Sequence, residues 1–77
     1  MATMHERPFD LLNKALGQQV LIRLKNGDDI RGKIMSFDVH MNLVIEGAEE
    51  LDEGGGVKAK LGTILLRGGN ILFVSPV

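Results

Sequence analysis

The clearest pattern in this chain is an alternation of apolar and polar positions over two neighbouring stretches, residues 19–25 and 29–37. In the first stretch Val20, Ile22 and Leu24 occupy every second position. A period of two is typical of a β-strand that buries one face. The pattern therefore predicts two strands, each with one inward face. The inward positions of the second strand are Ile30, Gly32 and Ile34.

Turn-forming residues join and bend these two strands. Asn26-Gly27 lies between them, and both residues tolerate the positive φ of a type I′ turn, so we expect a two-residue hairpin there. Gly32 lies in the middle of the second strand, where a glycine indicates a sharp bend or a close backbone approach. We therefore expect a strongly curved sheet, as at the corner of a small barrel.

Shorter segments predict the rest of the architecture. Pro8 suits the first turn of a helix, and an apolar stripe with helical spacing follows it. Residues 47–56 are acidic and rich in glycine, and we expect them to form a solvated loop. The remaining elements, in chain order, are predicted as a helix over residues 8–16 with the stripe Leu11, Leu12, Ala15 and Leu16, strands over 43–46 and 57–66, a tight turn over 67–70, and a strand over 71–75.

One helix followed by five closely spaced strands predicts a mainly β fold. It consists of a short N-terminal helix and a five-stranded, strongly bent antiparallel sheet, which forms a small open SH3-like barrel. Residues 1–7 are predicted to be a flexible lead and residues 8–77 a single domain. A chain of 77 residues has a core of marginal size. It has no cysteine for disulfide bonds, so we expect self-association to supply the missing burial.

Composition narrows the classes of function. The sequence shows no apolar run long enough for a membrane span and no signal-peptide pattern, so we expect a cytoplasmic location without a membrane partner. With two histidines and no cysteine, no metal site and no cofactor are predicted. Neither serine lies in a nucleophile motif, and the acidic residues cluster in a glycine-rich segment. The chain is therefore not expected to be an enzyme.

Charge and aromatic content argue against two common modes of nucleic-acid binding. The formal net charge of −1 does not suit a general duplex-binding protein. Aromatic residues make up only 4% of the chain, so a sheet of stacking aromatics is not expected. A few basic side chains, repeated by an oligomer, remain compatible with this composition.

Two segments resemble the sequence motifs of the Sm and Sm-like protein family. The first runs from Gly17 to Ile45 and contains the Asn-Gly turn, the mid-strand glycine and a polar loop before the third strand. The second is the apolar-Arg-Gly turn of residues 64–71, Ile-Leu-Leu-Arg-Gly-Gly-Asn-Ile. Both occur in the family's order and spacing, and the likeness covers nearly all of residues 8–76. One position departs from the family, which often has aspartate where this chain has Gly69.

The resemblance implies a function that periodicity alone does not indicate. In this family the fourth strand of one subunit pairs with the fifth strand of the next, which closes a ring of six or seven subunits, and seven is favoured here. The ring binds single-stranded, uridine-rich RNA at its central hole and supports RNA processing or turnover. Because it lacks the eukaryotic extensions, the chain is most similar to the archaeal members of the family. The rings of these members contain one type of chain. The expected partners are this RNA and further copies of the chain.

The same resemblance implies that the loops around residues 38–42 and 67–70 face the hole. Asn42 offers an amide donor and acceptor that match O4 and N3–H of uracil, and the planar groups of His40 and Arg67 suit stacking on a base. Because an amide that turns over would not distinguish uracil from cytosine, we also expect a backbone N–H at residue 68 or 69 to donate to O4. The predicted RNA-binding residues are His40, Met41, Asn42, Arg67, Gly68 and Gly69, with Asp38 as the residue that orients the loop.

These residues also have simpler structural interpretations. Asp38 and Asn42 can be turn residues that cap their own backbone. Taken alone, His40 is a solvated loop residue and Met41 a core or lining hydrophobe. Turn chemistry alone can explain residues 68–70.

An alternative function for the whole chain also stays open. It is a structural ring, or an SH3-like protein-interaction module, without intrinsic RNA specificity. Such a scaffold would not require Asn42 and Arg67 together, so this pair favours the RNA-binding interpretation.

Overall fold

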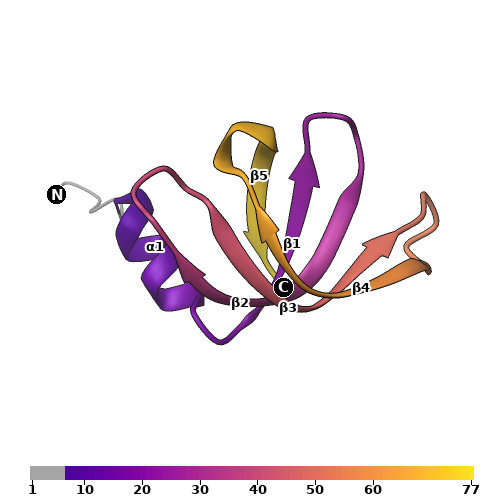
Figure 1. Ribbon diagram of the computed structural model, residues 1–77, viewed down its shortest axis with the longest axis horizontal. Helices are drawn as coiled ribbons and strands as arrows, with labels where there is room; N and C mark the ends of the chain where they lie inside the picture. Colours follow the sequence, from indigo (N-terminus) through magenta and orange to yellow (C-terminus); the bar gives the residue numbers. More distant parts are fainter. Residues whose placement is uncertain (1–6) are drawn as a thin grey trace, which may run out of the picture.

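The computed structural model describes residues 7–77, which form one curved antiparallel sheet beside a short helix (Figure 1). The strands lie in the order β4-β3-β2-β1-β5. The predicted mainly β fold of one helix and five antiparallel strands is confirmed. The elements are α1 (Pro8–Ala15), β1 (Gln19–Leu24), β2 (Asp29–Phe37), β3 (Leu43–Leu51), β4 (Val57–Leu66), the 3₁₀ turn η1 (Gly68–Asn70) and β5 (Ile71–Pro76).

The residues that the structure describes cover only part of the predicted division of the chain. The lead expected over residues 1–7 lies outside the described residues except for Arg7, which is extended with φ −69° and ψ 154°. The single domain expected over residues 8–77 and the cytoplasmic location stay predictions. No helix within the described part of the chain is long and apolar enough to cross a membrane.

The inward faces of β1, β2 and β3 form the core. Val20, Ile22 and Ile34 have no exposed surface, in agreement with the alternation of the sequence. Burial of each large aliphatic side chain contributes about 1.5–3 kcal/mol, so these inward positions hold the strands together across the bend. The buried residues are Leu12, Ala15, Val20, Ile22, Ile30, Ile34, Leu43, Ile45 and Ala48.

Gly32 allows β3 to cross close to β2 where the sheet bends. A Cβ atom at this position would collide with the side chain of Ile45 and would lie 3.1 Å from the Cα of Ala48. The register of the β2–β3 pair shifts at the same place, between Arg31 and Lys33. The close backbone approach expected of Gly32 is therefore confirmed, and any side chain here would overpack the bend.

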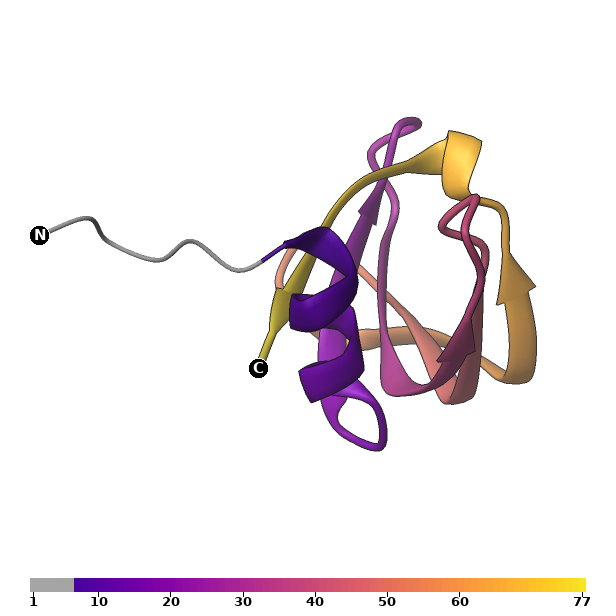
Figure 2. The same cartoon turned by 90° about the vertical axis from the view of Figure 1, so that its left-hand side faces the viewer.

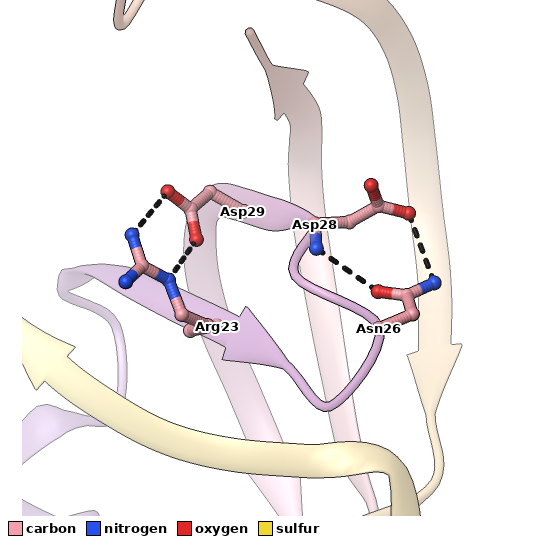
Figure 3. Close-up of polar contacts among 4 residues, drawn as sticks. All are labelled: Arg23, Asn26, Asp28 and Asp29. Carbon is pink, nitrogen blue, oxygen red and sulfur yellow. Dashed lines mark hydrogen bonds and ion pairs between the residues drawn. The ribbon is translucent and has the colours of Figure 1, made fainter. Parts of the chain in front are cut away.

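The turn between β1 and β2 is not the predicted type I′ turn. Gly27 has a φ of 95°, but Asn26 is not among the residues with positive φ. The Gly27 N–H donates to the Leu24 carbonyl at 2.9 Å, and the Leu24 N–H donates to the Asp28 carbonyl at 2.8 Å. This is a three-residue loop, a type I turn followed by a left-handed glycine. The Asn26 Oδ1 accepts the Asp28 N–H at 2.9 Å and stabilises this loop (Figure 3).

An ion pair beside this turn links the two strands. The Arg23 guanidinium donates to both carboxylate oxygens of Asp29, at 2.7 and 2.9 Å (Figure 3). The guanidinium carbon also lies 5.4 Å from the ring centroid of Phe73 on β5. Because the Arg23 side chain is exposed and solvent screens its charge, these contacts contribute little to stability. Together they connect β2, β1 and β5 on the outer face of the sheet.

Strand β3 is longer than expected. It continues through the predicted loop of residues 47–56 as far as Leu51. Glu49 lies opposite Arg31 on β2 and opposite Lys60 on β4, and Arg31 Nη2 donates to Glu49 Oε1 at 2.9 Å. The acidic segment therefore faces cations on both neighbouring strands, which favours pairing over a solvated loop. The prediction of a loop from residue 47 is wrong for this reason.

Both edges of the sheet carry exposed apolar side chains. β4 and β5 lie at the two ends of the strand order and do not pair with each other. Leu65 on β4 is 64% exposed, and Leu72 on β5 is 60% exposed. An open edge with apolar side chains favours pairing with another chain. The exposed apolar residues on these edges are Val57, Leu61 and Leu65 on β4 and Leu72 and Phe73 on β5.

Helix α1 lies in front of the curved sheet (Figure 2). Leu12 and Ala15 are buried against the sheet, whereas Leu11 is 46% and Leu16 is 36% exposed. Only half of the predicted apolar stripe is therefore buried. An apolar pocket of about 270 Å³ lies between the helix and β5. The sheet therefore covers only part of the apolar stripe of the helix.

Candidate nucleic-acid interface

Two segments that are distant in sequence meet beside η1 (Figure 2). The Gly68 N–H donates to Asn42 Oδ1 at 2.9 Å, which joins the turn before β5 to the loop before β3. A Cβ atom at Gly68 would collide with the carbonyl oxygen of His40 and would lie 2.9 Å from that of Met41. Only a glycine permits this approach. The structure thus brings together the two segments in which the sequence placed the candidate site.

The Asn42 side chain is held in one orientation. Its Oδ1 accepts the Gly68 N–H, and its Nδ2 donates to Asp38 Oδ2 at 3.0 Å. Turning the amide over would place Nδ2 against the Gly68 N–H and Oδ1 against the Asp38 carboxylate. Both internal hydrogen bonds would be lost, and like atoms would face each other in their place. An asparagine amide has two hydrogens and two acceptor lone pairs, so both atoms keep one further bonding position.

This arrangement corrects one prediction about base recognition. The Gly68 N–H is engaged by Asn42, so it is not free to donate to uracil as expected. A corresponding role for the Gly69 N–H stays a prediction. A backbone donor is needed for base selection only if the Asn42 amide can turn over, and the two partners of the amide remove that freedom.

Asp38 accepts three hydrogen bonds within its own loop. Its Oδ1 accepts the backbone N–H of His40 at 2.9 Å and that of Asn42 at 3.0 Å, and its Oδ2 accepts the Asn42 amide. The hydrogen bond from the Asn42 side chain, followed by those from the backbone, holds the pKa of the Asp38 carboxyl below its usual value. One carboxylate therefore caps the loop backbone and fixes the amide at the same time.

The lowered pKa of Asp38 predicts how the stability of the loop depends on pH. A carboxyl whose pKa is depressed in the folded state contributes stability above its unfolded value of about 3.9, and this is lost as the pH falls through the folded value. We expect the free energy of unfolding at neutral pH to be larger for the wild type than for Asp38→Asn, whose side chain does not titrate. The difference should narrow as the pH falls from about 5 towards 3. Denaturant titrations of both proteins at one protein concentration measure this difference in free energy of unfolding. A difference that did not change with pH would contradict the stabilising role of the Asp38 carboxylate.

A shallow cleft of about 590 Å³ opens between the two loops. The exposed side chains of His40 and Arg67 border it. Among the residues that the structure describes, the Arg67 guanidinium has no hydrogen-bond or ion-pair partner. Planar groups that are not engaged by the protein remain available to a ligand. The cleft is lined by His40, Asn42, Arg67, Gly69 and Asn70.

Met41 lies on the other side of the loop. It has a φ of 63°, and no other non-glycine residue among residues 7–77 has a positive φ. Its side chain packs against the core and lines the apolar pocket beside α1. A left-handed backbone costs a residue of this type about 1–3 kcal/mol, which burial of the side chain offsets. Packing of the Met41 side chain against the core thus fixes the position of the loop. A contact between Met41 and RNA stays a prediction.

Asn70 is the residue at the cleft that sequence reasoning assigned to turn chemistry alone. Its N–H donates to the Arg67 carbonyl at 2.9 Å, and its carbonyl accepts the Lys25 N–H at 2.8 Å. The backbone of Asn70 therefore makes the turn, while the residue also lines the cleft. Its place directly after two glycines was the only signal in the sequence.

Comparison with known proteins agrees with this geometry. The model of the LSM domain family matches residues 10–76. A provisionally named snRNP Sm-like protein of Methanosarcina barkeri is 48% identical over 73 residues, which cover 95% of this chain and all of the relative. A protein of the same description from Thermococcus onnurineus is 46% identical over 74 residues, covering 96% of this chain and 94% of the relative.

Solved structures show the same fold. An Sm protein of Pyrococcus abyssii in complex with a uridine heptamer superposes with a TM-score of 0.88 at 39% identity, covering 94% of this chain and 100% of that one. A heptameric archaeal Sm protein gives a TM-score of 0.81 at 47% identity, covering 88% and 97%. With a family model that matches residues 10–76 and relatives of this identity, the chain belongs to the LSM domain family, the Sm and Sm-like proteins.

Proposed function

We propose that copies of this chain close into a ring of seven that binds single-stranded, uridine-rich RNA at its central hole and serves RNA processing or turnover. The heptameric archaeal Sm protein and the Pyrococcus abyssii complex with a uridine heptamer support both parts of the proposal. The role is binding rather than catalysis. The RNA contacts are assigned to the loops that meet at Asn42 and Gly68.

The observation that carries the proposal is the fixed Asn42 amide. Gly68 and Asp38 determine which end of the amide is the acceptor and which is the donor. Uracil presents an acceptor, O4, next to a donor, N3–H, and can bond to the free positions of both ends. Cytosine presents a donor amino group next to an acceptor nitrogen, so its order is reversed. Binding cytosine would require the amide to turn over and break both internal hydrogen bonds.

The planar side chains at the cleft supply affinity without distinguishing bases. Stacking of a base on a planar side chain is worth about 1–3 kcal/mol. His40 and Arg67 border the same cleft as Asn42, so a base bound to the amide lies within their reach. Arg67 also brings a positive charge that the formal net charge of −1 conceals. In a ring this charge is repeated once per subunit, where it attracts the phosphate backbone.

The open edges of the sheet support the ring. β4 and β5 each lack a neighbour on one side and expose apolar side chains. Head-to-tail pairing of β4 with the β5 of the next copy satisfies both edges, and a closed ring leaves none unpaired. Pairing also adds the burial that a chain of 77 residues lacks.

Filter binding with oligo(U), oligo(C) and oligo(A) of equal length tests the function. We expect oligo(U) to bind at least about tenfold more tightly than the other two, because each reversed base leaves polar groups unpaired. Equal binding of all three, or of none, would instead support a scaffold without RNA specificity.

A further inference from the structure

We propose that the cleft recognises the keto–imino edge that uracil shares with hypoxanthine and guanine, and that Gly69 leaves the room in which the larger purine rings fit. The inference rests on the proposed function and defines its ligand class. It makes uridine one member of the recognised class, so that inosine and guanosine within a uridine-rich strand are accepted while adenosine and cytidine are rejected.

The hydrogen-bonding argument follows from the orientation of one amide. Gly68 leaves Asn42 Oδ1 as an acceptor and Asp38 leaves Nδ2 as a donor. The amide therefore selects any base with an acceptor oxygen beside a ring N–H. Uracil has O4 and N3–H, and hypoxanthine and guanine have O6 and N1–H. Cytosine and adenine both have an amino group beside an unprotonated ring nitrogen, which is the reverse order.

The space for a purine comes from residue 69. Gly69 lines the cleft, and a Cβ atom at this residue would meet no other atom within 4 Å. The neighbouring Gly68 differs, because the backbone of residues 40 and 41 occupies the space that a side chain at Gly68 would need. Gly69 therefore leaves open space at the cleft, whereas the space beside Gly68 is occupied.

The test uses pairs of bases that differ only at the edge concerned. RNA heptamers of the form UUUXUUU carry uridine, cytidine, inosine, adenosine or guanosine at X, and their affinities for the 77-residue chain are measured by fluorescence anisotropy. Inosine and adenosine have the same two rings, as uridine and cytidine have the same single ring. We expect inosine to bind more tightly than adenosine by about the factor that separates uridine from cytidine, roughly tenfold. Guanosine should follow inosine.

The outcomes separate this inference from the proposed function. If uridine exceeds cytidine while inosine and adenosine bind equally, the inference is overturned and the proposed function stands. If neither pair is distinguished, both fail. In Asn42→Ala both differences should disappear together, because both depend on one amide.

Gly69→Asp tests the space assigned to residue 69. The added side chain enters open space, so the fold should tolerate it. We expect the ratio of inosine-heptamer affinity to all-uridine-heptamer affinity to fall about tenfold, because the added carboxylate takes up the space that the second purine ring would occupy. An unchanged ratio of inosine to uridine binding would overturn the role of Gly69.

Discussion

Leu72→Lys should convert the ring into single chains of 8.4 kDa and weaken the binding of oligo(U) by about 100-fold or more. Leu72 is 60% exposed on β5, one of the two open edges of the sheet. In the proposed ring this edge pairs with β4 of the next copy, so a lysine there would be buried without a partner. The affinity falls because it comes from weak sites repeated around the ring rather than from one strong site.

Leu16→Lys is the matched control for this variant. It is the same substitution at an exposed leucine, which is 36% exposed and lies between α1 and β1 rather than on an edge. This variant should keep the mass of the wild-type assembly. Light scattering measures both masses, and circular dichroism shows whether the Leu72→Lys chain is still folded. A Leu72→Lys protein with the mass and oligo(U) affinity of the wild type would refute the assignment of β5 to the ring contact.

Asn42→Ala should abolish most of the preference for uridine, whereas Arg67→Ala should weaken the binding of all sequences. The first change removes the amide whose donor and acceptor order is fixed by Gly68 and Asp38. We expect the ratio of oligo(U) to oligo(C) affinity to fall from about tenfold or more to near unity. The second change removes a planar cation at the cleft, and the loss should be about tenfold for each oligonucleotide.

Arg67→Lys separates stacking from charge. Lysine keeps the positive charge but lacks the planar guanidinium. We expect Arg67→Lys to resemble Arg67→Ala at high salt and to recover part of the affinity at low salt, where attraction to phosphate is less screened. Affinities for oligo(U) and oligo(C) at two salt concentrations give all the required ratios. If Arg67→Ala changed the preference between the two bases more than Asn42→Ala does, the roles of the two residues would have to be exchanged.

Much of this fold follows from local sequence patterns. The alternation around Val20 and Ile22 predicts β1, and the same pattern with a central Gly32 predicts both the course of β2 and its bend. These features are visible in the sequence because each depends on the period of a strand or on a single glycine. These strands bury only one face, so apolar and polar residues alternate along them and the strands can be recognised in the sequence.

Other features depend on contacts between distant residues and are less visible. The length of β3 follows from the pairing of Glu49 with Arg31 on β2, and no local pattern marks an acidic segment as a strand. The candidate residues could be named from their motifs, but the hydrogen bond between Gly68 and Asn42 joins residues 26 positions apart. The orientation of the amide, and with it the basis of base selection, required the folded chain.

Native mass spectrometry of the 77-residue chain with equimolar U7 and C7 tests the central claim most directly, because it reports assembly and base selection together. The account predicts an assembly of seven chains that carries one U7 strand and little or no C7. Single chains, or a seven-chain assembly that binds U7 and C7 equally, would contradict it.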